Sequence, residues 1–370
     1  REEWYVTQES FVKDLLQKDP EEIKKRKIPI TRDQSLMPAE LEENRTPEGI
    51  REAQKAVGEM LWLVTRSRPD LMFSTARIGA NATKHPSQVM AIYQQLKGYL
   101  KATEDEGLVF STDGQGPIMI EALADASFSP DGEESHGAFL IQVGGCPIFW
   151  RSGRQQLVAL STAEAEMMEI VQGMLAGESI AVIAEEVFPE VIRRVWSDSQ
   201  AAISILTNEG GNWRTRHLRM RAAAARQSIS RGDWALQHQM GESMIADVGT
   251  KALASPRLEK LKREMGMRKR PRVEDPELVR VEEGSAEKGL AQALPRERLH
   301  EGVQPEGAGD TSCDQGSGVK GRVSVDLADT EKVRRAIQII TFAAERRLTW
   351  ECAHQLSSSR RDSTMDIRRN

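Results

Sequence analysis

The sequence predicts an α/β fold over residues 117–255, in which helices pack against a mixed five-stranded sheet. Two observations lead to this expectation. Three short apolar segments separated by turn residues come first, which is typical of consecutive antiparallel strands. A long helical segment follows, and strand and helix segments then alternate, which indicates strands joined through helices.

Five segments have the length and apolar content of strands. They are residues 118–125, 137–143, 147–152, 194–197 and 234–240. Gly144-Gly145, between the second and the third, favours a tight hairpin turn. The first three segments are therefore expected to be antiparallel neighbours.

Helices are expected at residues 161–187, 201–206, 215–228 and 243–253. The longest begins with the capping-box pattern Ser161-Thr162-Ala163-Glu164, in which Ser161 is the N-cap and Glu164 bonds back to its amide. This assignment gives Glu164 a structural role.

Residues 1–111 are expected to be mostly helical and to form a separate region. Apolar residues recur at helical spacing over 48–65, 71–81 and 87–101, and the breaks between these segments contain Pro69 and Pro86.

Residues 256–370 lose this periodicity and are rich in Glu, Arg, Gly, Ser and Pro, so a largely disordered tail is expected. Residues 330–353 are an exception, because their apolar residues fall on one helical face. That segment is compatible with a solvated helix and with a docking element.

Composition leaves a nucleic-acid partner open. The 370 residues suit two or three domains, and the apolar fraction of 39% is enough for one or two cores. The net charge of -5 conceals basic clusters at 24–27, 214–221 and 268–272. The last cluster resembles a nuclear localisation tract, a pattern that is also common in charged tails.

Three widely spaced cysteines argue against a disulfide framework and favour a reducing compartment. The expected location is the cytoplasm or the nucleus. No continuous apolar run has membrane-spanning length, so no membrane partner is expected. The first residues, Arg1-Glu2-Glu3, lack an initiator Met and a signal-peptide pattern, which suggests a piece of a longer chain.

Four acids stand out by their positions. Asp125 and Asp198 end predicted strands, Glu166 lies in the first turns of the long helix, and Asp247 lies in the last predicted helix. Carboxylates that converge above a sheet repel one another unless a cation neutralises them. Oxygen ligands of this kind suit Mg²⁺. Each acid taken singly is better explained as a solvated loop or cap residue, whereas the set in this element order favours a metal site.

The long helix offers three acids, and position distinguishes them. Glu164 is assigned to the capping box, whereas Glu166 lies on the flank of the apolar stripe and is expected to face the sheet. Glu169, three residues further along, is expected to be solvated.

These residues carry a family resemblance. The segments LVALSTAEAEM, VWSDSQAAI, RTRHLRMR and ADVGTKAL resemble the ribonuclease H region of copia-like LTR retrotransposon Pol polyproteins. Upstream, MLWLVTRSRPDLMFSTARIGANATKHPSQVMAIYQQLKGYLKAT resembles the end of their reverse transcriptase. The resemblance runs from about Trp4 to Leu253 and depends on the shared order and spacing of short motifs.

The resemblance implies a ribonuclease H-like domain at 117–255, preceded by a thumb- or connection-like end of the reverse transcriptase. It implies that Asp125, Glu166, Asp198 and Asp247 bind two Mg²⁺ ions, with Mn²⁺ as an alternative. Such ions lie about 3.5–4 Å apart and hydrolyse a phosphodiester, here in the RNA strand of an RNA/DNA hybrid. Ser127 stands where the family often has a second Asp, which is not one of the four ligands.

A basic group is expected to bind the nucleic acid, and it comprises Arg214, Arg216, His217, Arg219 and Lys251. The alternative for the first four is a solvated helix face, but phosphate contact is favoured because the cluster directly follows the Asp198 segment. His217 is also compatible with a packing or capping role. His238 falls within the last predicted strand, where a catalytic role is not expected.

Polymerase activity is not expected, because the chain contains no Asp-Asp dipeptide of the kind that a reverse transcriptase requires. Two alternatives to an active nuclease stay open. One is an inactive retroelement remnant that binds nucleic acid, and the other is a host protein that acts through residues 330–353.

Overall fold

The computed structural model describes residues 3–18, 22–36, 38, 40–111, 117–129, 134–207 and 219–270. All of them belong to one compact unit, and residues 271–370 lie outside the described residues. The predicted helix at 330–353 also lies outside them, so its role stays a prediction.

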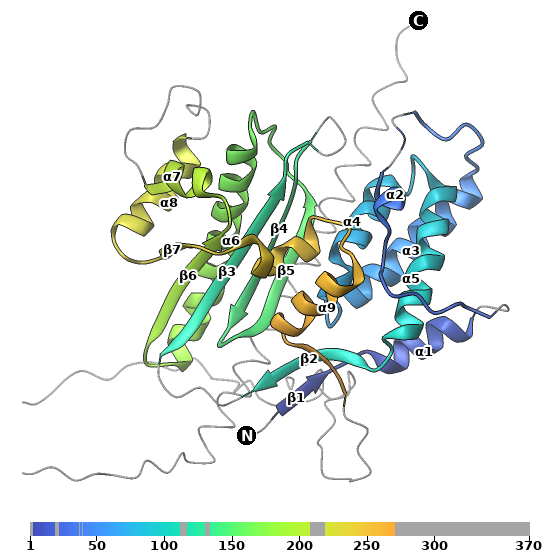
Figure 1. Ribbon diagram of the computed structural model, residues 1–370, viewed down its shortest axis with the longest axis horizontal. Coiled ribbons are helices and arrows are strands. Elements are labelled where there is room, and N and C mark those ends of the chain that lie inside the picture. Colours follow the sequence, from blue (N-terminus) through green and yellow to red (C-terminus); the bar gives the residue numbers. More distant parts are fainter. Residues whose placement is uncertain are drawn as a thin grey trace, which may run out of the picture. The chain divides into compact units, whose positions relative to one another are not determined.

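A five-stranded sheet forms the centre of the second half of the chain (Figure 1). Its strands are β3 (Ile118–Ser127), β4 (His136–Val143), β5 (Cys146–Arg154), β6 (Val191–Ser197) and β7 (Ala235–His238). Their order in space is β5-β4-β3-β6-β7. Strands β3, β4 and β5 are antiparallel neighbours, whereas β6 and β7 extend the sheet in parallel with β3.

This strand order and these directions define the ribonuclease H fold, so the predicted fold class is confirmed. Gly144 and Gly145 form the predicted hairpin turn between β4 and β5. Both have positive φ, 58° and 79°, which glycine adopts without the steric cost that a Cβ would bring.

Helix α6 (Thr162–Val187) packs on one face of the sheet, against β3, β4 and β6. Two glycines allow the close approach. A Cβ at Gly173 would touch Ala122 and Phe139, and one at Gly177 would lie 2.5 Å from the Trp234 ring. Helix α6 is long and apolar enough to cross a membrane, but 61% of its most apolar window is buried inside this fold, as expected of a core helix.

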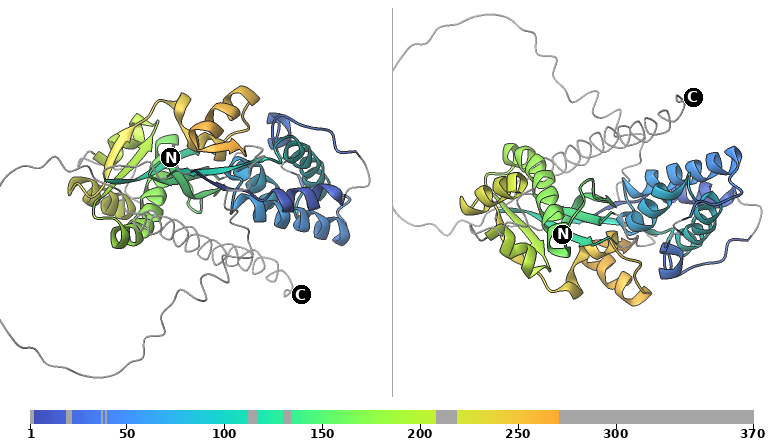
Figure 2. Two further views of the ribbon diagram at one scale, coloured as in Figure 1. Left: turned by 90° about the horizontal axis from the view of Figure 1, so that it is seen from below. Right: turned by 90° about the horizontal axis from the view of Figure 1, so that it is seen from above.

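The opposite face of the sheet is covered by a segment from the end of the described chain (Figure 2). It contains η3 (Gly241–Ser243), η4 (Ile245–Gly249) and α9 (Ser255–Glu264). Gly249 of η4 comes so close to β4 that an added Cβ would lie 2.4 Å from the Ala138 Cβ. The single helix predicted over 243–253 is therefore wrong, because this segment follows the sheet surface in short 3-10 turns.

Two shorter helices, α7 (Gln200–Thr207) and α8 (Arg219–Ser230), lie between β6 and β7 in the sequence. They contact each other, and both also contact α6. They complete the layer of helices on that side of the sheet.

The first hundred residues are mostly helical, as predicted, with six helical elements in the described residues. These are α1 (Glu9–Gln17), α2 (Arg32–Ser35), α3 (Pro47–Val64), η1 (Pro69–Leu71), α4 (Met72–Asn81) and α5 (Pro86–Ala102). A small antiparallel sheet accompanies them, in the order β1 (Glu3–Val6), β2 (Glu106–Ser111) and β8 (Met267–Lys269).

Strand β8 shows that the predicted tail boundary after Ser255 is too early. Helix α9 buries Leu258 and Leu261, and β8 pairs with β2, so residues 255–270 belong to the folded unit. The sequence carries no local signal for this boundary, because β8 is held by pairing with β2 of the N-terminal region. Arg268 and Lys269 of the predicted localisation tract lie in this strand.

The helical region and the central sheet share one core. The Trp150 indole on β5 donates to the Val64 carbonyl at the end of α3, over 2.6 Å. Phe73 on α4 meets His136 on β4 edge to face, with ring centroids 5.4 Å apart. The predicted thumb- or connection-like region is thus a neighbour on which the sheet packs.

Candidate active site

The first candidate acid, Asp125, projects from β3 toward the face that η4 covers. Its neighbour Ala124 faces α6 through Gly173, and side chains alternate along a strand, so Asp125 points the other way. It is 1% exposed and accepts a hydrogen bond from the Thr250 hydroxyl. Thr250 follows η4 directly. The segment that contains η3, η4 and α9, the closing segment, therefore completes the surroundings of Asp125.

Strand register brings Asp198 to the same edge of the sheet. Strands β3 and β6 are parallel, and Leu123 pairs with Trp196, so Asp125 and Asp198 each lie two residues beyond the last pair. Asp198 is half-buried in the turn that leads into α7, where the Ser199 hydroxyl accepts from the Ala202 amide as a helix cap. The carboxyl ends of two neighbouring parallel strands thus carry one acid each.

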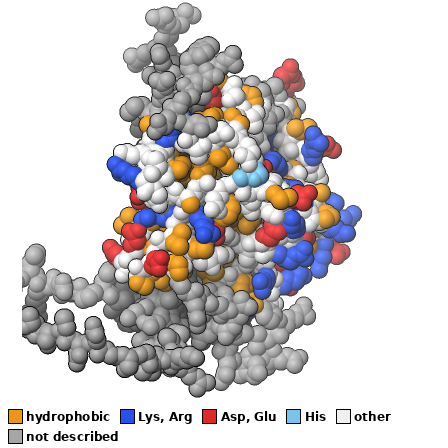
Figure 3. Space-filling view, turned by 60° about the vertical axis from the view of Figure 1, so that its left-hand side comes forward, with side chains coloured by type: hydrophobic (Ala, Val, Ile, Leu, Met, Phe, Trp, Pro, Cys, Tyr) orange, Lys and Arg blue, Asp and Glu red, His pale blue; other side chains and the backbone are white. Residues whose placement is uncertain are grey.

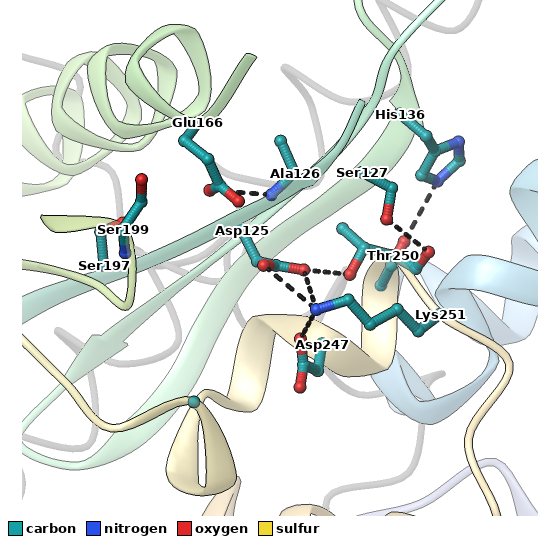
Figure 4. Close-up of polar contacts among 12 residues, drawn as sticks. Asp125, Ala126, Ser127, His136, Glu166, Ser197, Ser199, Asp247, Thr250 and Lys251 are labelled. Carbon is teal, nitrogen blue, oxygen red and sulfur yellow. Dashed lines mark hydrogen bonds and ion pairs between the residues drawn. The ribbon is translucent and has the colours of Figure 1, made fainter. Parts of the chain in front are cut away.

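Glu166 reaches the same place from helix α6. Its Oε2 accepts a hydrogen bond from the Ala126 backbone amide over 3.1 Å, and its side chain is 5% exposed (Figure 4). Ala126 lies beyond the last β3–β6 pair, so its amide is available to the carboxylate. The expectation that Glu166 faces the sheet agrees with this geometry.

Asp125, Glu166 and Asp198 converge. One carboxylate oxygen from each lies within 4.8 Å of the others. Burial, with repulsion from Asp125 and Asp198, raises the pKa of Glu166 to about 9. Burial also raises the pKa of Asp125 to about 6, although Lys251 and the Thr250 hydroxyl oppose the rise. A cation among the three would relieve this repulsion, and an all-oxygen donor set fits a hard divalent ion.

The fourth predicted acid, Asp247, lies nearby but outside this group of three. It is 2% exposed, and cationic side chains bond to both of its oxygens. Lys251 pairs with Oδ1 and Arg257 pairs with Oδ2. Arg257 also donates to the Gly241 carbonyl over 2.7 Å, which ties α9 to η3.

Lys251, predicted to contact nucleic acid, lies inside the acidic site. Its Nζ is 3.3 Å from Asp125 Oδ2 and also pairs with Asp247 (Figure 4). Burial alone would lower the pKa of Lys251, but the attraction of Asp125 and Asp247 outweighs it and raises this pKa to about 12. The ammonium therefore stays charged at neutral pH.

Sequence reasoning missed two partners of the acids, Thr250 and Arg257. Thr250 follows Asp247 by three residues, so the spacing in ADVGTK could have indicated it. Arg257 could not be inferred, because the sequence predicts a disordered tail over residues 256–370.

Two expectations about the other acids of α6 need correction. Glu169, expected to be solvated, is 5% exposed and accepts from the Gln155 side chain over 3.0 Å. Burial raises its pKa to about 7, although Gln155 and Arg151 oppose the rise. Glu164 bonds to the Leu160 amide over 2.7 Å instead of the predicted Ser161 amide, while Ser161 caps the helix as expected.

The predicted basic group is only partly described. Arg214, Arg216 and His217 lie outside the described residues, and so does the side chain of Arg219. Their roles stay predictions. His238 lies in β7, and its Nε2 is 3.2 Å from the Asp198 carbonyl, so it borders the site through the backbone.

Comparison with known proteins gives relatives of two kinds. "Secreted RxLR effector protein 161" of Plasmopara viticola is 30% identical over 116 residues, which cover 31% of this chain and 81% of that protein. "Retrovirus-related Pol polyprotein from transposon RE2" of Arabidopsis thaliana is 24% identical over 222 residues, 58% of this chain. "Transposon Ty1-JR1 Gag-Pol polyprotein" of Saccharomyces cerevisiae is 24% identical over 221 residues.

No protein-family profile matches the chain. Among solved structures, ribonuclease H1 from Halobacterium salinarum NRC-1 matches 38% of this chain and 98% of its own, at 16% identity and a TM-score of 0.26.

The sheet order defines a ribonuclease H-like fold, and three acids converge at one edge of its sheet. The chain is similar to retrovirus-related Pol polyproteins of transposons over 58% of its length, in agreement with the resemblance of its motifs. It spans only 15% of the length of the Arabidopsis polyprotein and 12% of the yeast one.

Proposed function

We propose that this chain is the ribonuclease H part of a copia-like retrotransposon Pol polyprotein and hydrolyses the RNA strand of RNA/DNA hybrids. One observation carries the proposal. Asp125, Glu166 and Asp198 bring carboxylate oxygens within 4.8 Å of one another at the edge of this sheet. The resemblance adds Asp247 and a second divalent ion to the site.

The donor set supports Mg²⁺ or Mn²⁺ as the resident cation, because hard divalent ions prefer oxygen ligands. When bound, divalent ions in such a site supply a polarised water and stabilise charge on the scissile phosphate. Asp125 is the central holder, since it neighbours both the other two acids and Lys251. Thr250 and the Ala126 amide fix the orientations of Asp125 and Glu166.

The surface supports contact with a polyanion. Arg257 of helix α9 borders the site through Asp247, and Figure 3 shows Lys and Arg side chains gathered along one edge of the face drawn there. Arg214, Arg216, His217 and Arg219 would add phosphate contacts. Selectivity for RNA would come from 2′-hydroxyls in the shallow groove of the hybrid.

The test is cleavage of a labelled RNA/DNA hybrid in Mg²⁺ by the full chain and by Asp125→Asn. We expect RNA cleavage by the native chain and a loss of at least about 100-fold in the variant, because a central ligand is removed. Asp14→Asn, an exposed change far from the site in the sequence, is the matched control and should cleave normally. Hybrid binding without cleavage would favour the inactive remnant instead.

A further inference from the structure

The ammonium of Lys251 occupies a defined place between two carboxylates. Lys251 follows Asp247 by four residues, and its Nζ lies 3.3 Å from Oδ2 and 3.4 Å from Oδ1 of Asp125. On its other side, it pairs with Oδ1 of Asp247 (Figure 4). The two acids therefore share one positive charge that belongs to the protein.

Both carboxylate oxygens of Asp247 are paired with cationic side chains. Its second oxygen pairs with Arg257, which is anchored in turn by the Gly241 carbonyl. A divalent ion that entered between Asp125 and Asp247 would meet the Lys251 charge at close range. At such distances the repulsion between two cations is large unless one of them leaves.

Glu166 and Asp198 present the opposite situation. Neither makes a salt bridge with a Lys, Arg or His among the residues that the structure describes. Four carboxylates in this neighbourhood are thus matched by two bonded cationic side chains, Lys251 and Arg257. With all four acids deprotonated, as cation binding requires, the uncompensated charge of two suits one divalent ion at the group formed by Asp125, Glu166 and Asp198.

We propose that the Lys251 ammonium occupies the position between Asp125 and Asp247 that a second metal ion would otherwise take. The free protein then takes one divalent ion at the three converging acids, and a second ion binds only when Lys251 is withdrawn. This inference deepens the proposed function and rests on it. It makes Lys251 a positioning residue that controls how many ions the site holds, in place of the nucleic-acid contact predicted from the sequence.

The test counts Mn²⁺ ions bound to the full chain without nucleic acid, by electron paramagnetic resonance of free Mn²⁺ in a titration. We expect one ion on the native chain and two on Lys251→Met. The second ion should disappear in Lys251→Met combined with Asp247→Asn, which restores the formal charge of the native chain. Lys260→Met is the matched control, because its side chain is also 43% exposed and bonds outside the acid group, and it should bind one ion.

The outcomes separate this inference from the function on which it rests. Two ions on the native chain would overturn the role of Lys251 and leave the metal site standing. One ion on both the native chain and folded Lys251→Met would also overturn it. No ion on any variant would remove the metal site itself, and the inference with it. Lys251→Gln, checked by thermal melting, repeats the count if the Met variant does not fold.

Discussion

The Oε2 atom of Glu166 accepts a hydrogen bond from the backbone amide of Ala126 over 3.1 Å, which ties helix α6 to strand β3 beside the acid group. A buried carboxylate that faces two others has its charged form disfavoured, and its pKa is raised accordingly. A neutral side chain at the position of Glu166 would therefore stabilise the folded protein.

This relationship predicts opposite effects of Glu166→Gln on stability and activity. The amide oxygen keeps the Ala126 hydrogen bond and removes the repulsion, so melting in EDTA should rise by several degrees. Cleavage of an RNA/DNA hybrid in Mg²⁺ should fall at least about 100-fold. Calorimetry and a cleavage assay check both parts. Glu186→Gln, exposed on the same helix, should change neither, and an unaltered cleavage rate in Glu166→Gln would contradict the site.

The close approach of Gly249 to the sheet leads to a prediction about stability and cleavage. An added Cβ would lie 2.4 Å from the Ala138 Cβ and 3.0 Å from the end of Met72, so Gly249→Ala must push η4 outward. Overpacking of this kind costs about 1–3 kcal/mol. Because η4 carries Asp247 and precedes Thr250, cleavage should also fall.

Urea unfolding and the cleavage assay measure the two effects of Gly249→Ala. Gly153→Ala is the matched control, since nothing lies within 4 Å of its added Cβ. Equal stability and activity in the two alanine variants would show that η4 is free to move without consequence.

The raised pKa of Glu169 predicts that the stability of the protein depends on pH. Its pKa is about 7 in the folded protein against 4.5 for an ordinary Glu. A raised pKa means that the folded state binds the proton more tightly, so stability is fully present below pH 4.5 and declines as pH rises toward 7. The shift corresponds to roughly 3 kcal/mol at most.

Glu169→Gln removes that decline and keeps an acceptor for Gln155. Unfolding in urea at pH 5 and pH 8 should show a smaller difference for the variant than for the native chain. Glu186→Gln serves as the control and should retain the native difference. The same pH dependence in all three proteins would refute the shifted titration of Glu169.

A buried ion pair in the helical region predicts a large stability effect. Arg68 donates to Asp70 through Nε over 2.9 Å and through Nη2 over 2.8 Å, and both side chains are almost fully buried. Asp70→Asn leaves the guanidinium without its counter-charge, which should cost about 3–5 kcal/mol.

The comparison for Asp70→Asn is Glu48→Gln, which breaks an exposed pair with Arg51 and should change stability by less than about 1 kcal/mol. Denaturant unfolding of both variants decides the question. Losses of similar size would mean that the buried pair has no special structural role.

The sequence predicted the sheet and the three converging acids because their signals are local. Strand alternation, the glycine turn and the capping box identify β3 to β6 and distinguish Glu166 from Glu164. Glu169 could not be assigned the same way, since its burial depends on Gln155 from the end of β5. Helix periodicity alone does not reveal such a partner.

The closing segment was the least predictable part. A helical pattern over 243–253 is compatible with an α-helix, but the segment forms 3-10 turns that bring Gly249 close to Ala138 of the sheet. Strand β8 pairs with β2, and Lys262 of α9 forms an ion pair with Glu106 of β2, more than a hundred residues earlier in the chain. Contacts at that separation leave no periodic signal in the segment itself.

The central claim is that Asp125, Glu166 and Asp198 hold one divalent cation together. Anomalous diffraction from crystals of the protein soaked in Mn²⁺ tests it most directly. We predict a peak bonded to carboxylate oxygens of all three residues. A peak that contacts none of them, or no peak at a Mn²⁺ concentration that supports hybrid cleavage, would contradict the claim.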